Sequence, residues 1–308
     1  MQVPLYVDAC MKELLSVIKC GSTAYLMQQS MFLSPIKAVE FLNEHRVNTL
    51  CWVASALTII SGLGAFEDIK PEYMRTVCFG SEVFPVKQLQ LWQSACPGAR
   101  FINLYGPTEA TGMSFYYVVD RDFSDGEPIP VGRPFDNTGF MLLREDDTEA
   151  APGETGEICI RGTALTHGYF DDPERTAAAF TQNPLNKHYP ELIYRTGDLG
   201  RLNERGELVF VSRKDHQIKN MGHRVELGEI EACADGCEGV VRSCCKFDKQ
   251  KGKLLMFYMG AADEKTLGKY LRSMLPRYML PSKIKRLDAL PLLENGKIDR
   301  NSLKDMEI

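Results

Sequence analysis

The stretch RFINLYGPTE, residues 100–109, decides the fold class. Arg100–Leu104 has the composition of a buried strand, and the Gly-Pro pair after it predicts a turn. In an α/β protein such a turn lies at the carboxyl edge of the sheet, where ligands bind. In such a position the threonine (Thr108) could donate to a phosphate oxygen, the carboxylate (Glu109) could hold Mg²⁺, and the ring (Tyr105) could stack on a flat ring. A plain strand-turn-helix connection capped by Thr108 explains the same residues, so both interpretations stay open.

The chain before this stretch alternates between helical and strand-like segments. Such alternation predicts an α/β fold with a largely parallel sheet. The helical segments are Ala9–Lys19, Pro35–His45 and Pro85–Ala95, and the strand-like ones are Ser22–Leu26, Arg46–Val53 and Thr76–Phe79.

After about Val118 the pattern changes. Helical periodicity disappears, and short strand-like runs between Gly and Pro residues predict a small β-barrel or sandwich. Charge density rises after Val211, where we place a hinge, and a compact α+β domain is expected beyond it. We therefore expect an α/β part at 1–120, a β-barrel-like part at 121–212 and a mobile C-terminal α+β domain at 213–308. The strand-like runs are Thr138–Leu143, Gly156–Arg161, Leu199–Leu202 and Leu208–Val211; the C-terminal elements are Leu227–Ala234, Val240–Phe247, Leu254–Met259 and Glu264–Met274.

Composition excludes several classes of protein. Of the 308 residues, 44% are hydrophobic and 25% charged, as in ordinary globular proteins, and the net charge of −5 argues against a nucleic-acid partner. The longest apolar run, residues 49–64, is too short to cross a membrane. The ten cysteines are irregularly spaced and no signal-peptide pattern is present, so we expect a cytoplasmic protein with reduced thiols.

Three further motifs carry possible chemistry. In YRTGDL (194–199), Asp198 suits the two hydroxyls of a ribose, although a surface turn explains it equally. The second motif is SRKDHQIK (212–219), followed by GHRVELGEIE (222–231). Taken alone, it is explained by a solvated charge run that leads into a helix. The third motif is NGKIDR (295–300). Taken alone, it is explained by an Asn-Gly turn with an exposed lysine.

Together these motifs, with GEICIRGTALTHGYF (156–170) and LPRYMLP (275–281), occur in an order that resembles the adenylate-forming (AMP-binding) enzymes. This superfamily includes amino-acid adenylation domains of nonribosomal peptide synthetases, D-alanine–carrier-protein ligases, acyl-CoA synthetases and luciferases. The wording NLYGPTE and YRTGDL is typical of the amino-acid branch. The resemblance covers nearly the whole chain and implies a large α/β adenylation domain with a β-barrel, followed by a small mobile domain.

The resemblance also implies cofactors, partners and roles. ATP, yielding AMP, would be bound with Mg²⁺, and an amino acid or small carboxylate would pass to a carrier-protein thiol or to CoA. The implied roles are Lys297 and Thr108 in catalysis; Glu109 at Mg²⁺; Asn103, Tyr105, Tyr194 and Gly80-Ser81-Glu82 around the adenine; Asp198 and Arg213 at the ribose; Asp8, Lys12 and Gly106 at the substrate; Asp215 as hinge; and Lys219 in thioester formation.

One family motif is absent from these 308 residues: the Ser/Thr/Gly-rich phosphate loop that ends in Pro-Lys-Gly. We therefore expect a C-terminal fragment that is weakly active or inactive alone, with a complementary N-terminal half as a possible partner. Two alternatives remain: an acyl-CoA synthetase-like ligase, and a non-catalytic remnant that binds AMP or a partner chain. Gly80, where D-alanine ligases carry Cys, argues against D-alanine as the substrate.

Overall fold

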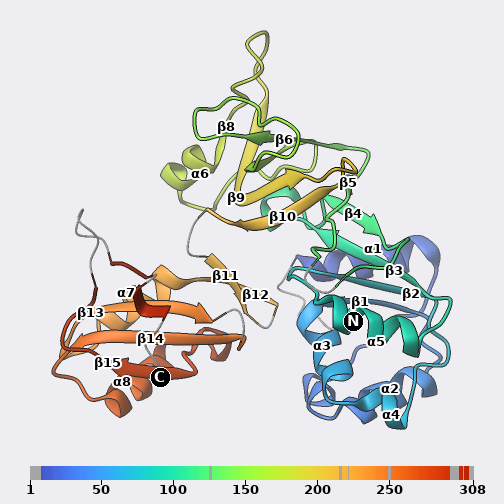
Figure 1. The fold of residues 1–308 in the computed structure, drawn as a ribbon, viewed down its shortest axis with the longest axis horizontal. Helices are drawn as coiled ribbons and strands as arrows, with labels where there is room; N and C mark the ends of the chain where they lie inside the picture. The colour runs from blue at the N-terminus through green and yellow to red at the C-terminus, as the bar shows by residue number, and fades with distance from the viewer. Residues whose placement is uncertain are drawn as a thin grey trace. The chain divides into compact units, whose positions relative to one another are not determined.

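The computed structural model describes residues 8–124, 127–214, 217–220, 222–248, 251–291, 298–300 and 302–304. The chain divides into two compact units, Met1–Lys214 and Asp215–Ile308, which are described separately (Figure 1). Within the described residues, the helices are all too short or too polar to span a bilayer.

A five-stranded sheet organises the first half of unit one. Its strands lie in the order β1-β2-β3-β4-β5, and the first three pair in parallel. The last two pair antiparallel, so the sheet is mixed at one edge. This confirms the predicted α/β class with a largely parallel sheet. The bounds are β1 (Thr49–Val53), β2 (Thr76–Gly80), β3 (Arg100–Tyr105), β4 (Phe115–Val118) and β5 (Arg133–Pro134).

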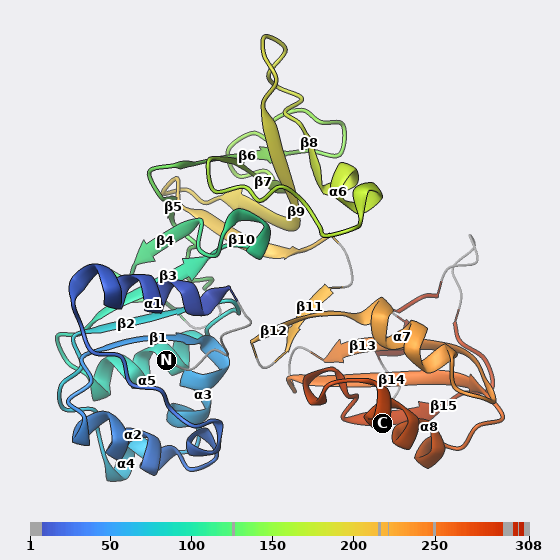
Figure 2. The same cartoon turned by 180° about the vertical axis from the view of Figure 1, so that it is seen from behind.

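Helices cover both faces of this sheet. On one face, α2 (Pro35–Glu44), α3 (Ala54–Gly62), α4 (Ala65–Asp68) and α5 (Val86–Ala95) enclose the main core, while α1 (Ala9–Cys20) lies on the opposite side (Figures 1 and 2). Trp92 on α5 is fully buried there, and its indole N–H donates to the carbonyl of Leu57 on α3 at 3.0 Å. A 3₁₀ turn, η1 (Gln29–Leu33), precedes α2.

The predicted strand at Ser22–Leu26 is wrong. These residues form no strand and are exposed. The Tyr25 ring stacks on His45, the residue that follows α2, with 4.5 Å between ring centroids, and it also packs edge-on against Phe41 of α2, so the segment contacts a helix and not a neighbouring strand.

A second, antiparallel sheet follows in the same unit. Its strands lie in the order β10-β9-β7-β6, and β8 also pairs with β9. Their inner residues share a core with the end of the first sheet, since Tyr105 and Phe115 cluster with Ile158 and Leu208. The bounds are β6 (Thr138–Leu143), β7 (Gly156–Gly162), β8 (Phe180–Gln182), β9 (Leu192–Leu202) and β10 (Leu208–Arg213).

The prediction that helices disappear after Val118 needs one correction. A short helix, α6 (Pro173–Ala179), lies between β7 and β8. Asp172 caps it by accepting from the N–H of Arg175 at 3.0 Å, and Pro173 is its first residue. A helix of two turns is too short to show periodicity, but the Asp-Pro pair is a start signal.

Unit two has the expected α+β composition. A three-stranded sheet, β13-β14-β15, packs with two helices, and a separate hairpin is formed by β11 and β12. The bounds are β11 (Gln217–Asn220), β12 (His223–Glu226), α7 (Leu227–Asp235), β13 (Val240–Asp248), β14 (Lys253–Gly260), α8 (Glu264–Met274), η3 (Arg277–Met279), β15 (Lys283–Arg286) and η4 (Ser302–Lys304).

An ion pair anchors the C-terminal motif of unit two. Both carboxylate oxygens of Glu231 on α7 accept from the guanidinium of Arg300, at 2.5 and 2.8 Å. Arg300 also donates to the carbonyl of Cys245 on β13. The N–H of Asp299 donates to the carbonyl of Pro291 at 2.8 Å, so these two residues lie side by side.

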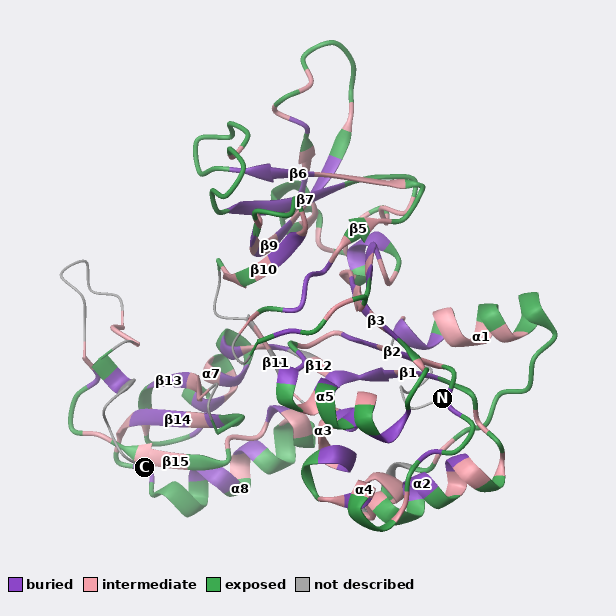
Figure 3. Cartoon of the chain, turned by 45° about the vertical axis from the view of Figure 1, so that its right-hand side comes forward, coloured by how far each residue is buried: buried purple, intermediate pink, exposed green. Residues whose placement is uncertain are grey.

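Much of α1 is exposed (Figure 3), and its exposed residues include large apolar ones. Met11, Leu15 and Ile18 are 48%, 57% and 76% exposed, and their spacing places them on one side of the helix. Scattered surface apolar residues are ordinary, whereas a contiguous apolar stripe favours association.

We expect this stripe to cause self-association of the isolated chain. The double variant Leu15→Lys/Ile18→Lys should shift the chain toward monomer, because it places charges where apolar area would be buried. Light scattering over a concentration series measures this. A control, Val83→Lys/Val241→Lys, makes the same charge change at two separate exposed positions and should leave association unchanged. Chain that is strictly monomeric at high concentration contradicts the prediction.

Candidate functional site

The turn after β3 is built on a close backbone approach at Gly106. A Cβ at this position would lie 2.1 Å from the carbonyl oxygen of Gly112 and 2.8 Å from the Cα of Met113. The N–H of Ser114 donates to the carbonyl of Tyr105 at 2.8 Å, which closes the loop. The loop contains η2 (Thr108–Ala110), so Thr108 and Glu109 are presented from a rigid support.

Asp198 on β9 joins this turn to the second sheet. One of its carboxylate oxygens accepts from the Tyr105 hydroxyl at 2.5 Å, and the other accepts from the Arg213 guanidinium at 2.6 Å. Arg213 lies opposite Asp198 in the β10–β9 register. Burial, together with the nearby Asp198 charge, raises the pKa of Tyr105 well above its usual value, so the hydroxyl remains a donor. The structure thus brings together three residues predicted to surround the nucleotide.

The backbone around Asp198 is held by neighbouring side chains. Thr196 donates from its hydroxyl to the carbonyl of Ile158 at 2.6 Å and accepts from the N–H of Asp198 at 3.0 Å. Glu157 on β7 accepts from the N–H of Gly197 at 3.0 Å. These bonds fix the Thr-Gly-Asp segment, which leaves Asp198 little freedom to change position.

Glu109, the predicted Mg²⁺ ligand, is buried beside Tyr169. Its Oε1 accepts from the Tyr169 hydroxyl at 2.6 Å, and its backbone carbonyl accepts from the N–H of Thr166 at 2.9 Å. Arg175 lies over the Tyr169 ring, 4.4 Å from the centroid. Among the residues that the structure describes, no group of three or more His, Cys, Asp or Glu side chains is arranged to hold a metal ion.

The Gly80-Ser81-Glu82 segment follows β2. A Cβ on Gly80 would lie 2.2 Å from the carbonyl oxygen of Leu104, so glycine lets β2 and β3 approach at their ends. Ser81 adopts a φ of +66°, a conformation that glycine reaches without strain. The Glu82 carboxylate accepts from the N–H of Ser55 at 2.9 Å, which ties this segment to α3.

Asp8 and Lys12 lie at opposite ends of the first turn of α1. The Asp8 Oδ2 is 3.8 Å from the position of a Cβ on Gly112, which places it beside the 106–114 loop. Lys12 lines a small pocket that also contains Gly80 and Ser81. The structure therefore brings the predicted substrate residues next to two of the predicted adenine-contacting residues.

Other predicted residues lie elsewhere. The Asn103 amide donates to the carbonyl of Pro130 at 2.8 Å, and the buried ring of Tyr194 packs against Phe180 at 5.0 Å. Thr108 is exposed on the 106–114 loop. Lys219 lies in β11, whereas Asp215 and Lys297 lie outside the described residues.

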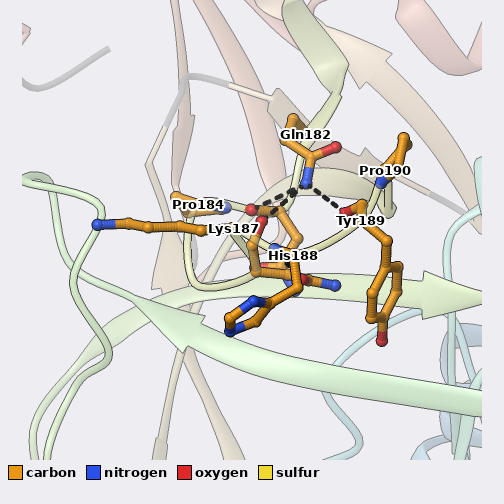
Figure 4. Close-up of a pocket in the computed structure, with 8 residues that line it drawn as sticks. Gln182, Pro184, Lys187, His188, Tyr189 and Pro190 are labelled. Carbon is orange, nitrogen blue, oxygen red and sulfur yellow. Dashed lines mark hydrogen bonds between the residues drawn. The ribbon is translucent and has the colours of Figure 1, made fainter.

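One surface hollow lies away from these motifs. It has a volume of about 510 Å³ and is formed by the loop between β8 and β9 (Figure 4). The Gln182 amide points into this loop and donates to the carbonyl of Asn186 at 3.0 Å. It contains none of the predicted residues, so the smaller pocket at Lys12 is the better candidate.

Several residues of this site have no role that the sequence motifs predict. Tyr169 lies in the GEICIRGTALTHGYF segment, whose family resemblance was the available signal. Cys51 and Met113 line the pocket with Lys12, but neither belongs to a motif. Only the fold brings them to it.

We expect Gly106→Ala to destabilise unit one. The added Cβ would overlap the Gly112 and Met113 backbone, and such overpacking costs about 2 kcal/mol or more of the free energy of unfolding. Urea unfolding measures the loss. Gly62→Ala is the control, because its Cβ would meet only Gln88 at 3.8 Å and alanine favours the helix. Equal stability of the two variants would show that the turn is not held by this contact.

Comparison with known proteins places the chain in a family. Residues 1–170 match the sequence profile of the AMP-binding enzyme family. The chain is 34% identical to tyrocidine synthase 2 of Brevibacillus parabrevis over 305 residues, which are 97% of this chain and 8% of that protein.

Comparison with solved structures supports the same family. The crystal structure of IdnL1 superposes with a TM-score of 0.84 and 30% identity, covering 94% of this chain and 60% of that one. Holo-PA1221, an NRPS protein containing adenylation and PCP domains, superposes with a TM-score of 0.81 and 28% identity, covering 98% of this chain and 52% of that one. The chain thus spans only part of each relative. It belongs to the AMP-binding enzyme family.

Proposed function

We propose that the protein containing this chain activates an amino acid with ATP and passes the acyl group to a carrier-protein thiol. The observation that carries the proposal is the gathering of Tyr105, Asp198 and Arg213 beside the 106–114 loop. A buried carboxylate held by a cation and a hydroxyl is preorganised to accept ribose hydroxyls, since each carboxylate oxygen can accept two bonds. The similarity to an NRPS protein with adenylation and PCP domains supports an amino acid as substrate and a carrier as acceptor.

In the first step, a carboxylate oxygen of the amino acid attacks the α-phosphorus of ATP. A new P–O bond forms, the bond to the β-phosphate oxygen breaks, and pyrophosphate leaves with the electron pair. Glu109 would hold Mg²⁺ together with phosphate oxygens, because this ion usually takes one or two carboxylates plus substrate phosphates. Thr108 would donate to a phosphate oxygen. Lys297 would bridge the attacking carboxylate and the phosphate.

The adenosine would lie between the two sheets of unit one. Asp198 and Arg213 would bind the ribose, and the backbone of residues 80–82 would run along the adenine. Asn103, Tyr105 and Tyr194 would frame that site from β3 and β9. For Asn103 and Tyr194 this support is indirect, because their side chains contact Pro130 and Phe180.

In the second step, the carrier thiol attacks the acyl carbon, the C–O bond to AMP breaks, and AMP leaves. Rotation about Asp215 would replace Lys297 by the face of β11 that contains Lys219. Asp8 and Gly106 would hold the amino acid during both steps, Asp8 by pairing with its α-ammonium group.

A binding experiment tests the nucleotide site. We expect AMP to bind the chain and Asp198→Asn to weaken AMP binding by about tenfold or more, because hydrogen bonds to a charged acceptor are lost. Isothermal titration calorimetry measures both affinities. Asp147→Asn is the matched control, since Asp147 also pairs with an arginine, Arg195, but is half exposed. Unchanged affinity in Asp198→Asn would remove the assigned role.

A second experiment separates the two lysines. It uses this chain joined to a family segment that carries the phosphate loop. Lys297→Ala should lower ATP–pyrophosphate exchange by about 10²–10³ while sparing transfer from preformed adenylate, because its charge acts on the first transition state. Lys219→Ala should do the reverse.

The same assay decides between the alternatives. Exchange with amino acids but not with fatty acids supports the proposal, and the opposite result favours an acyl-CoA synthetase-like ligase. Equal damage by both lysine variants to one half-reaction would contradict alternation about Asp215. No exchange above background with any acid would favour a non-catalytic remnant.

A further inference from the structure

A small pocket lies at the carboxyl ends of β1 and β2, beneath α1. It is shallow, and it opens beside the segments that the proposed function assigns to adenine and substrate. Lys12 is the only charged residue among those that line it. The lining residues are Lys12, Cys51, Trp52, Val53, Phe79, Gly80, Ser81, Leu104 and Met113.

The thiol in this pocket adds no charge. Cys51 lies opposite Cys78 in the β1–β2 register. A hydrogen bond between the two thiols, together with burial, raises the pKa of Cys51 well above its usual value. Cys51 is therefore neutral at pH 7, and the ammonium group of Lys12 is the one charge in the described pocket wall, although the charge of the nearby Glu13 also acts on Cys51.

Lys12 has one hydrogen-bond partner in the described part of the chain. Its Nζ donates to the carbonyl of Ala9 at 2.7 Å, which leaves two of its three N–H donors for a ligand. No carboxylate of the described residues lies within salt-bridge distance of it. The neighbouring Glu13 does not line the pocket; burial raises the pKa of its carboxyl, and the nearby Lys12 charge acts in the opposite direction. A half-buried ammonium that forms no close ion pair with the described residues favours an anionic ligand.

Asp8 places a second charged group near the start of α1. The two residues are four apart at the start of α1, so they lie on the same side of the helix. Asp8 Oδ2 lies close to Gly112, whose neighbour Met113 lines the pocket. A carboxylate thus stands at one side and an ammonium in the pocket wall, which is the complement of a molecule with a cationic and an anionic end.

We propose that this pocket selects an amino acid whose side chain carries a carboxylate, with Lys12 as its counter-ion. The inference rests on the proposed function, in which Asp8 pairs with the α-ammonium group. A side chain without a negative charge would desolvate the Lys12 ammonium group without forming an ion pair with it, so neutral amino acids bind more weakly.

Stable adenylate analogues test the inference directly. Aminoacyl sulfamoyl-adenosines are prepared with glutamate, aspartate, glutamine, leucine and ornithine side chains, and calorimetry measures their affinity for the chain. Glutamine is nearly isosteric with glutamate but neutral. We expect an acidic analogue to bind at least about tenfold more tightly than the glutamine analogue, the difference typical of a charge-assisted hydrogen bond.

Three variants assign that difference to Lys12. Lys12→Met keeps the apolar stem and should abolish the preference for the acidic analogue. Lys12→Glu reverses the charge and should favour the ornithine analogue. Lys19→Met makes the same change as Lys12→Met at an exposed position of the same helix and should keep the wild-type preference.

The outcomes separate this inference from the proposed function. Equal affinity for the acidic and glutamine analogues, or a preference that survives in Lys12→Met, overturns the inference while AMP binding leaves the proposed function standing. If neither AMP nor any analogue binds, both are overturned. The thermal unfolding of each variant is measured as a check of its folding. A lost preference is interpreted only in variants that unfold as the wild type does.

Discussion

The contact of Tyr105 and Arg213 with Asp198 joins the two sheets of the first unit at one point. Tyr105 ends β3, Asp198 lies within β9 and Arg213 ends β10, so three chain segments meet at one carboxylate. Burying a carboxylate is costly unless it is paired and hydrogen-bonded, and here both oxygens are satisfied. Because the 106–114 loop begins at Tyr105, this contact also sets where Thr108 and Glu109 stand relative to the second sheet.

Charged groups in this unit fall into two kinds. Asp198 has Arg213 and Tyr105, and Glu109 has the Tyr169 hydroxyl, so these acidic groups are held in place before any ligand arrives. Preorganised groups of this kind lose little when they bind a substrate, because their positions do not change. Lys12 differs, since a backbone carbonyl is its partner in the described part of the chain. An ammonium group in a pocket wall that forms no close ion pair with the described residues favours a ligand of opposite charge.

The sequence predicted the regular elements well where they were long and periodic. The strands at 49–53, 76–80 and 100–105 were expected because apolar runs alternated with amphipathic helices. Two errors have local causes. Tyr25 stacks on His45, so the apolar character of Ser22–Leu26 served packing against a helix. The helix at 173–179 was missed because two turns show no period, although its Asp-Pro start was visible.

By itself the sequence determined the order of the motifs and the residue types that carry chemistry, since these depend on local spacing along the chain. It indicated that Asp198, Glu109 and Lys12 belong to a site, but not what each contacts. Tertiary structure placed Lys12 in the wall of the same pocket as Cys51. It also decided that Asp198 accepts from Tyr105 and that Glu109 accepts from Tyr169. The reason is physical: these partners are separated by tens of residues, and only the packing of sheets and helices brings such distant side chains within hydrogen-bond distance.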